Sequence, residues 1–264
     1  MRLYEIETPN ELTAAFNNAA DDDGWDTGAA PVVSNARSEV VNQEQQLMAM
    51  YKLAEEKIKT YCAPYIQAVG GIERALFTSS LFRGVRPEEV VYMDMTVRNP
   101  IHVIDVRQDR VPTDTPLDVS HMVDDWFQRE TGYRFRSQSL FTTGRRATAS
   151  AYGWPVVVLP VGEFHFCWSR EYKDMYQDMS DYAQARLMQI SSDSVQISNK
   201  KNISKYFGSS NEVDEFMRDG GYRFDTDLQS AIASSHEVMI VCSKAIILDS
   251  EWLKQVDFQL LHNT

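Results

Sequence analysis

The sequence predicts an α+β fold. Strand-like and helix-like segments are mingled along the chain without a regular strand-helix-strand alternation, which favours an antiparallel sheet with helices over a doubly wound parallel sheet. The chain has 264 residues, enough for one large domain with a sizeable core. Hydrophobic residues make up 43% and charged residues 24%, which are ordinary values for a globular protein, so the chain is expected to fold.

The N-terminal part differs in composition from the rest of the chain. Residues 1–45 are polar and acidic and carry several turn formers, so we interpret them as an extension and residues 46–264 as the main domain. From about Asn42 to Tyr65, apolar residues recur at three- and four-residue spacing, which predicts an amphipathic helix.

Strands and helices are expected in the following order along the main domain. Short runs rich in β-branched and aromatic residues predict strands at 75–85, 90–97, 101–111, 156–161, 164–169 and 236–249. Helical periodicity, with capping and stop residues, predicts helices at 114–135, 147–151, 171–187 and 225–233. In the first of these helices, Asp114 or Thr115 is the expected N-cap and Gly132 the expected stop.

Charge and cysteine content limit the function classes. The formal net charge of −12 argues against a broad electrostatic attraction to nucleic acid or to an anionic membrane. The three cysteines are widely spaced and fit neither a disulfide framework nor a zinc site, so reduced thiols in a cytoplasm are expected. The histidine spacings suit no standard metal site, and we expect no metal. No apolar run approaches the roughly 18 residues of a membrane span, so no membrane partner is expected.

Several familiar catalytic signatures are missing: the P-loop, the Rossmann glycine motif, the nucleophile elbow and the zinc-protease helix. Three other segments can carry chemistry, and the first is Leu-Phe-Arg-Gly-Val at 81–85. Arg83 ends an apolar strand, and Gly84 allows a close approach of the backbone. Because a guanidinium binds phosphate oxygens in a bidentate manner and keeps its charge, Arg83 suits an anion contact, with a surface ion pair as the alternative.

The second segment is Phe-Arg-Ser-Gln-Ser-Leu-Phe-Thr-Thr-Gly at 135–144. Hydroxyl side chains alternate there with larger ones at strand spacing, so Ser137 and Ser139 are expected to face the same way. Phe135 and Phe141 flank them. The alternative interpretation is a Ser/Thr-rich strand edge with an ordinary turn.

The third segment is Ser-Ser-His-Glu-Val-Met-Ile at 234–240. Glu237 stands at the start of a strongly apolar strand, and the mouth of a strand can present a carboxylate rigidly into a cleft. The alternative is a carboxylate that is exposed or paired in a salt bridge, as most charged groups at such edges are.

An arginine, a Ser-x-Ser pair and a glutamate, in this order on three strands, resemble the signature motifs of the ADP-ribosyltransferases of the Arg-Ser-Glu type, which include bacterial toxins and enzymes of bacterial viruses. The resemblance runs from about residue 75 to 250 and includes Phe-Thr-Thr-Gly at 141–144 and Leu-Pro-Val-Gly-Glu-Phe at 159–164. It implies an ADP-ribosyltransferase-like α+β fold, in which two facing antiparallel β-sheets with flanking helices form an NAD cleft. Residues 46–264 would be the catalytic domain.

The resemblance also implies an activity. It is that of a mono-ADP-ribosyltransferase, which cleaves its substrate NAD at the nicotinamide-ribose bond and moves ADP-ribose to a macromolecular acceptor. Glu237 matches the catalytic glutamate, Ser137 the first serine of the middle motif, and Arg83 the NAD-binding arginine. A fixed carboxylate stabilises the oxocarbenium-like transition state, Ser137 would orient it, and Arg83 would anchor the phosphates. The residues expected to contact NAD are Arg83, Gly84, Ser137, Ser139 and Phe141.

The acceptor is less well specified by the resemblance. It implies target recognition by the loop at 219–235, with Tyr222 and Phe224 as exposed aromatic candidates. Ser235 stands where the family commonly has Glu or Gln, and Gln138 replaces the middle Thr of the second motif. Because Ser235 cannot act as a strong base, the sequence argues against an arginine acceptor.

Three functional readings remain open at this point. The first is a host-directed transferase of phage or bacterial origin, acting in a cytoplasm, with a protein acceptor expected more than a nucleic acid. The second is an NAD glycohydrolase, in which water replaces the acceptor. The third is a catalytically silent binding or inhibitory module on the same fold.

Overall fold

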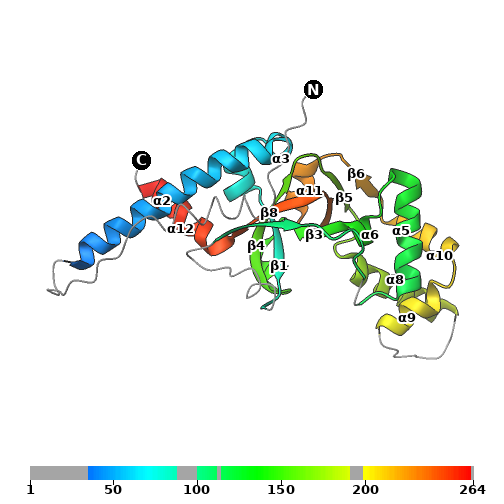
Figure 1. Cartoon of the computed structure of the whole chain (residues 1–264). Coiled ribbons are helices and arrows are strands. Elements are labelled where there is room, and N and C mark those ends of the chain that lie inside the picture. The colour runs from blue at the N-terminus through cyan, green and yellow to red at the C-terminus, as the bar shows by residue number, and fades with distance from the viewer. Residues whose placement is uncertain (1–34, 88–99, 112–113, 191–198, 263–264) are drawn as a thin grey trace, which may run out of the picture.

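The computed structural model describes residues 35–87, 100–111, 114–190 and 199–262 (Figure 1). Within them, eight strands form one antiparallel sheet in the order β2-β8-β4-β1-β3-β7-β5-β6. The strands are β1 (Leu81–Val85), β2 (Ile101–Asp105), β3 (Ser139–Thr143), β4 (Trp154–Val161), β5 (His165–Ser169), β6 (Tyr222–Phe224), β7 (Glu237–Val241) and β8 (Lys244–Asp249). The α+β class is confirmed, and the described strands belong to a single sheet.

Helices cover both faces of this sheet. They are α2 (Asn35–Tyr61), α3 (Ala63–Val69), the short π-helix η1 (Arg74–Thr78), α5 (Leu117–Thr131), α6 (Phe135–Gln138), α7 (Arg146–Ser150), α8 (Met175–Ile190), α9 (Asn199–Tyr206), α10 (Ser210–Asp219), α11 (Leu228–Ser234) and α12 (Ser250–His262). Figure 1 shows α2 and α12 together at one end of the molecule, and α5, α8, α9 and α10 at the other.

Two hydrophobic cores lie on opposite faces of strand β7. Val238 and Ile240 belong to the core built with α2, α3, α11 and α12, whereas Met239 and Val241 belong to the core built with α5, α8, α9 and α10. Side chains alternate along a strand, so Glu237 lies on the same face as Met239. The glutamate therefore begins its strand on the side of the sheet that α5 and α8 cover.

Strands β1 and β3 are neighbours at the centre of the sheet, but each pairs mainly with another strand. Strand β1 pairs with β4 along its whole length, and β3 pairs with β7 along its whole length. Between β1 and β3 the paired residues are Phe82 and Thr143. Thr143 in turn lies opposite Glu237. This junction brings the first, second and third sequence segments onto adjacent strands.

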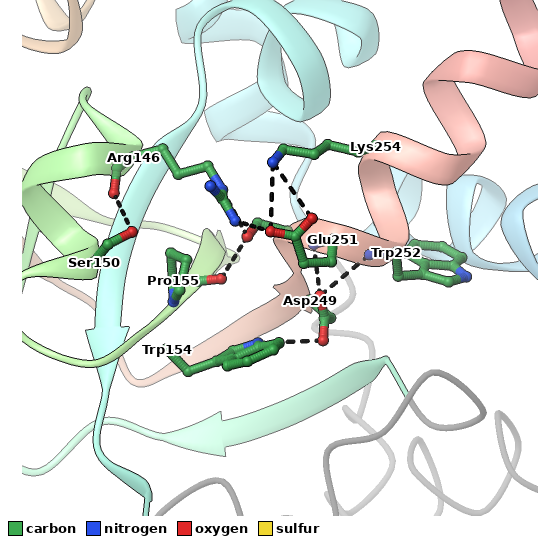
Figure 2. Close-up of polar contacts among 9 residues, drawn as sticks. Arg146, Ser150, Trp154, Pro155, Asp249, Glu251, Trp252 and Lys254 are labelled. Carbon is green, nitrogen blue, oxygen red and sulfur yellow. Dashed lines mark hydrogen bonds and ion pairs between the residues drawn. The ribbon is translucent and has the colours of Figure 1, made fainter.

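Helix α12 is fixed to the sheet by polar contacts shown in Figure 2. Asp249 at the end of β8 accepts hydrogen bonds from the main-chain N–H groups of Glu251 (2.6 Å) and Trp252 (3.2 Å), and from the indole N–H of Trp154 (3.3 Å). Arg146 of α7 pairs with Glu251. These contacts connect α7 and the start of β4 to α12, so both ends of the segment between α7 and β4 are held in place.

Several elements differ from the sequence-based predictions. Residues 74–78 form the π-helix η1 and not the start of a strand, and 236–249 divides into β7 and β8. Helices α9, α10 and α12 were not predicted, because their sequences are polar or follow directly on a strand. Helix α5 ends at Gly132 as expected, but its N-cap is Pro116, which offers no capping side chain. The strand predicted at 90–97 lies outside the described residues.

The N-terminal helix also differs in extent from its prediction. Helix α2 begins at Asn35, so it runs through residue 45, where the composition changes. Its later turns bury Tyr51, Ala54 and Ile58 against the core. Residues 1–34 lie outside the described residues. The three cysteines are buried and free, which agrees with the expected reduced thiols.

Candidate active site

The three segments singled out in the sequence meet at the centre of the sheet. Arg83 follows Phe82 on β1, Phe82 pairs with Thr143 at the end of β3, and Thr143 pairs with Glu237 at the start of β7. The backbones of Arg83, Thr143 and Glu237 are thus brought onto three neighbouring strands, although these residues stand far apart in the sequence. The antiparallel pairing produces this convergence, since strand β3 ends where β7 begins.

Glu237 is held by the segment that leads into helix α8. Its main-chain N–H donates to the carbonyl of Lys173 (2.8 Å), and its carboxylate accepts from the main-chain N–H of Met175, the first residue of α8. The side chain retains 19% exposure. A carboxylate at a helix N-terminus is stabilised by the free N–H groups there, so α8 fixes the orientation of Glu237.

The ionisation of Glu237 is shifted toward neutrality. Burial raises the pKa of Glu237 from 4.5 to about 7, and Asp174 acts in the same direction. The guanidinium groups of Arg136 and Arg110 oppose this shift because they favour the charged carboxylate. A buried carboxyl group whose pKa lies near the working pH, next to positive charge, is typical of a catalytic group.

Arg136 is a site residue that sequence reasoning missed. Its side chain is only 9% exposed, and its Nη1 lies 3.9 Å from Oε1 of Glu237. Its Nη2 donates to the hydroxyl of Thr115 (3.2 Å), and its main-chain N–H donates to Asp124 (2.8 Å). The guanidinium lies over the ring of Phe141, 4.9 Å from the centroid. Arg136 is therefore anchored at several points and directed toward the glutamate.

Arg110 is a second arginine that the sequence did not reveal. Its guanidinium lies 4.0 Å from the centroid of the Phe141 ring, and its main-chain N–H donates to the carbonyl of Ser137 (3.0 Å). The pKa of Arg110 is lowered to about 10, mainly by burial and in part by the positive charges of Arg83 and Arg136. Two guanidinium groups thus lie against the ring of Phe141, one of the residues expected to contact NAD.

The expected arrangement of Ser137 and Ser139 on one strand is wrong. Ser137 lies in the short helix α6, and β3 begins only at Ser139, so the two side chains do not share a strand face. Asp124 causes this difference, because its carboxylate accepts hydrogen bonds from the main-chain N–H groups of both Arg136 (2.8 Å) and Ser137 (3.3 Å). The hydroxyl of Ser139 donates to the carbonyl of Phe135.

Thr143 is the hydroxyl residue that lies across from Glu237. Its Oγ1 donates to the carbonyl of Ser235 (3.0 Å), two residues before the glutamate. Ser235 ends helix α11 in a left-handed conformation with φ 63°. The Phe-Thr-Thr-Gly part of the second segment, and not its Ser-x-Ser part, therefore fixes the backbone that leads into Glu237.

The two aromatic residues expected to be exposed for target recognition are half-buried. Tyr222 makes edge contacts with Phe127, and Phe224 packs against Phe127 and Phe135. Both belong to β6 and contribute to the core beneath α5. The expectation of exposure is wrong, because alternate aromatic residues in a Tyr-Arg-Phe strand turn toward a helix that the local sequence does not show.

Tyr152 lies at the rim of the site. It is 64% exposed, and its hydroxyl donates to Asp174 (3.1 Å), the residue that precedes α8. A Cβ atom at Gly84 would come within 2.3 Å of the Ala149 carbonyl and 2.8 Å of Tyr152. Gly84 therefore permits α7 and Tyr152 to pack directly on β1, beside Arg83.

A separate open pocket of about 420 Å³ lies near the other end of β7. Its lining includes Tyr133, His165, Val241 and Cys242, and none of the predicted site residues. The imidazole of His165 contacts the Tyr133 hydroxyl (2.7 Å) on one side and Asp225 (2.6 Å) on the other. We regard this pocket as distinct from the site at Glu237.

No group of three or more His, Cys, Asp and Glu side chains among the described residues could hold a metal ion. In the same part of the chain, no helix is long and apolar enough to cross a membrane. Comparison of the chain with family models, with curated proteins and with solved structures found no match.

The raised pKa of Glu237 predicts a pH-dependent stability. In the folded protein the pKa of Glu237 is about 7, whereas the ordinary pKa of a glutamate is 4.5. Between these values the folded state binds more protons than the unfolded chain, so the free energy of unfolding should fall as the pH rises toward and through 7. The contribution of this group is at most about 3 kcal/mol.

Urea unfolding at pH 5 and pH 8 measures this effect in the wild type and in Glu237→Gln. The wild type should lose more stability than the variant between the two pH values, because glutamine cannot ionise. Equal losses in the two proteins would show that Glu237 titrates normally.

Proposed function

We propose that the protein is a mono-ADP-ribosyltransferase, which cleaves NAD at the nicotinamide-ribose bond and transfers ADP-ribose to a macromolecular acceptor. The observation that carries the proposal is the convergence of Arg83, Thr143 and Glu237 on adjacent strands, together with the raised pKa of the Glu237 carboxyl group. The resemblance of these segments to the Arg-Ser-Glu enzymes supports the same reaction. An origin in a bacterium or a phage, and a host-directed acceptor, belong to the proposal as well.

The reaction breaks the bond between ribose C1′ and the ring nitrogen of nicotinamide. Nicotinamide leaves with the bonding electron pair, and positive charge develops on the ribose. The ionised Glu237 stabilises this charge and accepts a hydrogen bond from the ribose 2′-hydroxyl, as a carboxylate does in glycoside cleavage. The nucleophilic atom of the acceptor then bonds to C1′ and releases its proton to the solvent.

The other site residues position the substrate in this proposal. Arg83 anchors the diphosphate, so that binding energy remote from C1′ is used at the reacting carbon. Thr143 takes the positioning role expected of Ser137, because it holds the backbone before Glu237. The β2-β8-β4-β1 and β3-β7-β5-β6 halves of the sheet would correspond to the two facing sheets, with NAD at their junction.

NAD hydrolysis is the second candidate, and one observation favours it. Tyr222 and Phe224, the aromatic residues expected to contact an acceptor, are half-buried and pack against the core beneath α5. Ser235 offers no carboxylate to receive a proton from an acceptor side chain. With water as the acceptor, the same residues would act as a glycohydrolase.

Incubation of the purified protein with NAD labelled in its adenosine part tests the proposal. Nicotinamide release and label on macromolecules are followed with and without a bacterial lysate. A transferase should release nicotinamide and label protein, whereas a glycohydrolase should release nicotinamide without label. If neither occurs with any lysate, the catalytically silent module is the correct reading.

A further inference from the structure

Guanidinium groups are concentrated around Arg110, close to Glu237. Arg83, Arg86 and Arg136 all act electrostatically on Arg110, and Glu237 is the carboxylate that opposes them there. The chain as a whole carries a net charge of −12. A local cluster of guanidinium groups in an acidic protein lowers the stability of the free protein, because like charges repel. Such a cluster is best explained by an anionic ligand.

One nitrogen of this cluster lacks a partner. Nη1 of Arg110 is buried and forms no hydrogen bond with the described residues. Its guanidinium is held in place by contact with the face of Phe141. A buried, fixed and unpaired donor is costly in a native protein unless a ligand satisfies it, so Nη1 points to a missing acceptor.

The contact between Arg136 and Glu237 is also incomplete. The 3.9 Å between Nη1 of Arg136 and Oε1 of Glu237 is an ion pair but is too long for a hydrogen bond. The other terminal nitrogen of Arg136 is engaged by Thr115. Nη1 of Arg136 can therefore donate to a second acceptor. The guanidinium groups of Arg136 and Arg110 both lie against the ring of Phe141.

We propose that Arg110 and Arg136 form a binding site for a phosphoryl group, most suitably a diphosphate, and that the carboxylate of Glu237 competes with this anion for the two guanidinium groups. Planar guanidinium groups match phosphoryl oxygens in geometry and charge. As a site for the diphosphate of NAD, the proposal rests on the proposed function. The binding of inorganic pyrophosphate at this site does not depend on whether the protein cleaves NAD.

Competition with Glu237 makes anion binding depend on pH. Above about pH 7 Glu237 is ionised and repels the anion, so affinity should be lower there than below pH 7. The other groups that act on Glu237 are Arg136 on α6, Arg110 after β2, Asp174 before α8, Tyr152 after α7, Cys167 on β5 and Tyr222 on β6. Burial raises the pKa of Tyr152 to about 12 and raises the pKa of Cys167 and Tyr222 well above their usual values, so these three keep their protons.

Calorimetric titration with inorganic pyrophosphate tests the site. The proteins are the wild type, Arg110→Gln, Arg110→Lys and Glu237→Gln, each at pH 6 and pH 8. Arg110→Gln should weaken binding by about tenfold or more, and Arg110→Lys by less. Glu237→Gln should bind several times more tightly than the wild type at pH 8 and about equally at pH 6. Comparing variant and wild type at one pH removes the titration of pyrophosphate itself.

A matched arginine outside the site serves as the control. Arg134 lies two residues before Arg136 and pairs with Asp125 at the surface, so Arg134→Gln changes net charge equally and should leave affinity unchanged. Absence of binding to the wild type, or equal affinities for the wild type and a folded Arg110→Gln, would overturn the site. If Glu237→Gln and the wild type bind alike at pH 8, Glu237 does not compete. Nicotinamide release is measured separately, so the proposed function and the anion site can fail independently.

Discussion

Replacing Glu237 with glutamine should remove nicotinamide release from NAD while leaving the fold in place. The expected fall in rate is about a hundredfold or more, because the amide cannot stabilise developing positive charge. The fold should persist, since Glu237 is the first residue of β7 and the isosteric amide can still accept the hydrogen bond from the main-chain N–H of Met175. At pH 8 the variant should be at least as stable as the wild type, because it avoids a buried charge.

Nicotinamide release and thermal unfolding, measured on the same preparations, check this result. Glu130→Gln, which changes an exposed carboxylate on α5, is the matched control and should keep full activity. In the wild type, the rate should increase as the pH rises through about 7, where Glu237 becomes ionised. If a folded Glu237→Gln protein released nicotinamide at an undiminished rate, Glu237 would have no part in the reaction.

Replacing Gly144 with alanine should strongly destabilise the protein. Gly144 directly follows β3, and a Cβ atom there would lie 1.7 Å from the carbonyl oxygen of Ile232 in α11. That neighbour is backbone, so it cannot rotate away as a flexible side chain could. We expect a loss of about 3 kcal/mol or more, together with a displaced α11 and reduced activity.

Urea unfolding of Gly144→Ala measures this loss. Gly208→Ala is the matched control, because a Cβ atom there would meet nothing within 4 Å. The control should change the free energy of unfolding by no more than about 0.5 kcal/mol. Equal unfolding free energies for Gly144→Ala and the wild type would mean that α11 is not packed against the end of β3.

Much of the fold could be predicted from local patterns. Strands β1, β2, β4 and β5 are short apolar runs, and α5 and α8 have a clear apolar stripe, so their class followed from periodicity. The segment at 135–144 could not be predicted in this way. Its alternating hydroxyl residues suit a strand, but the buried carboxylate of Asp124 binds two main-chain N–H groups there and stabilises a helical turn. A contact with a residue on another helix overrode the local pattern.

The sequence by itself determined that the chain is α+β and marked Arg83 and Glu237 as residues able to bind an anion and to stabilise a cation. Only the tertiary structure decided what surrounds Glu237. The residues Arg110 and Arg136 carry no motif, and they reach the glutamate because α6 and the segment after β2 pack on the same ring of Phe141. The physical reason is that a pKa and a charge balance depend on burial and on distances across the fold, which residue order does not contain.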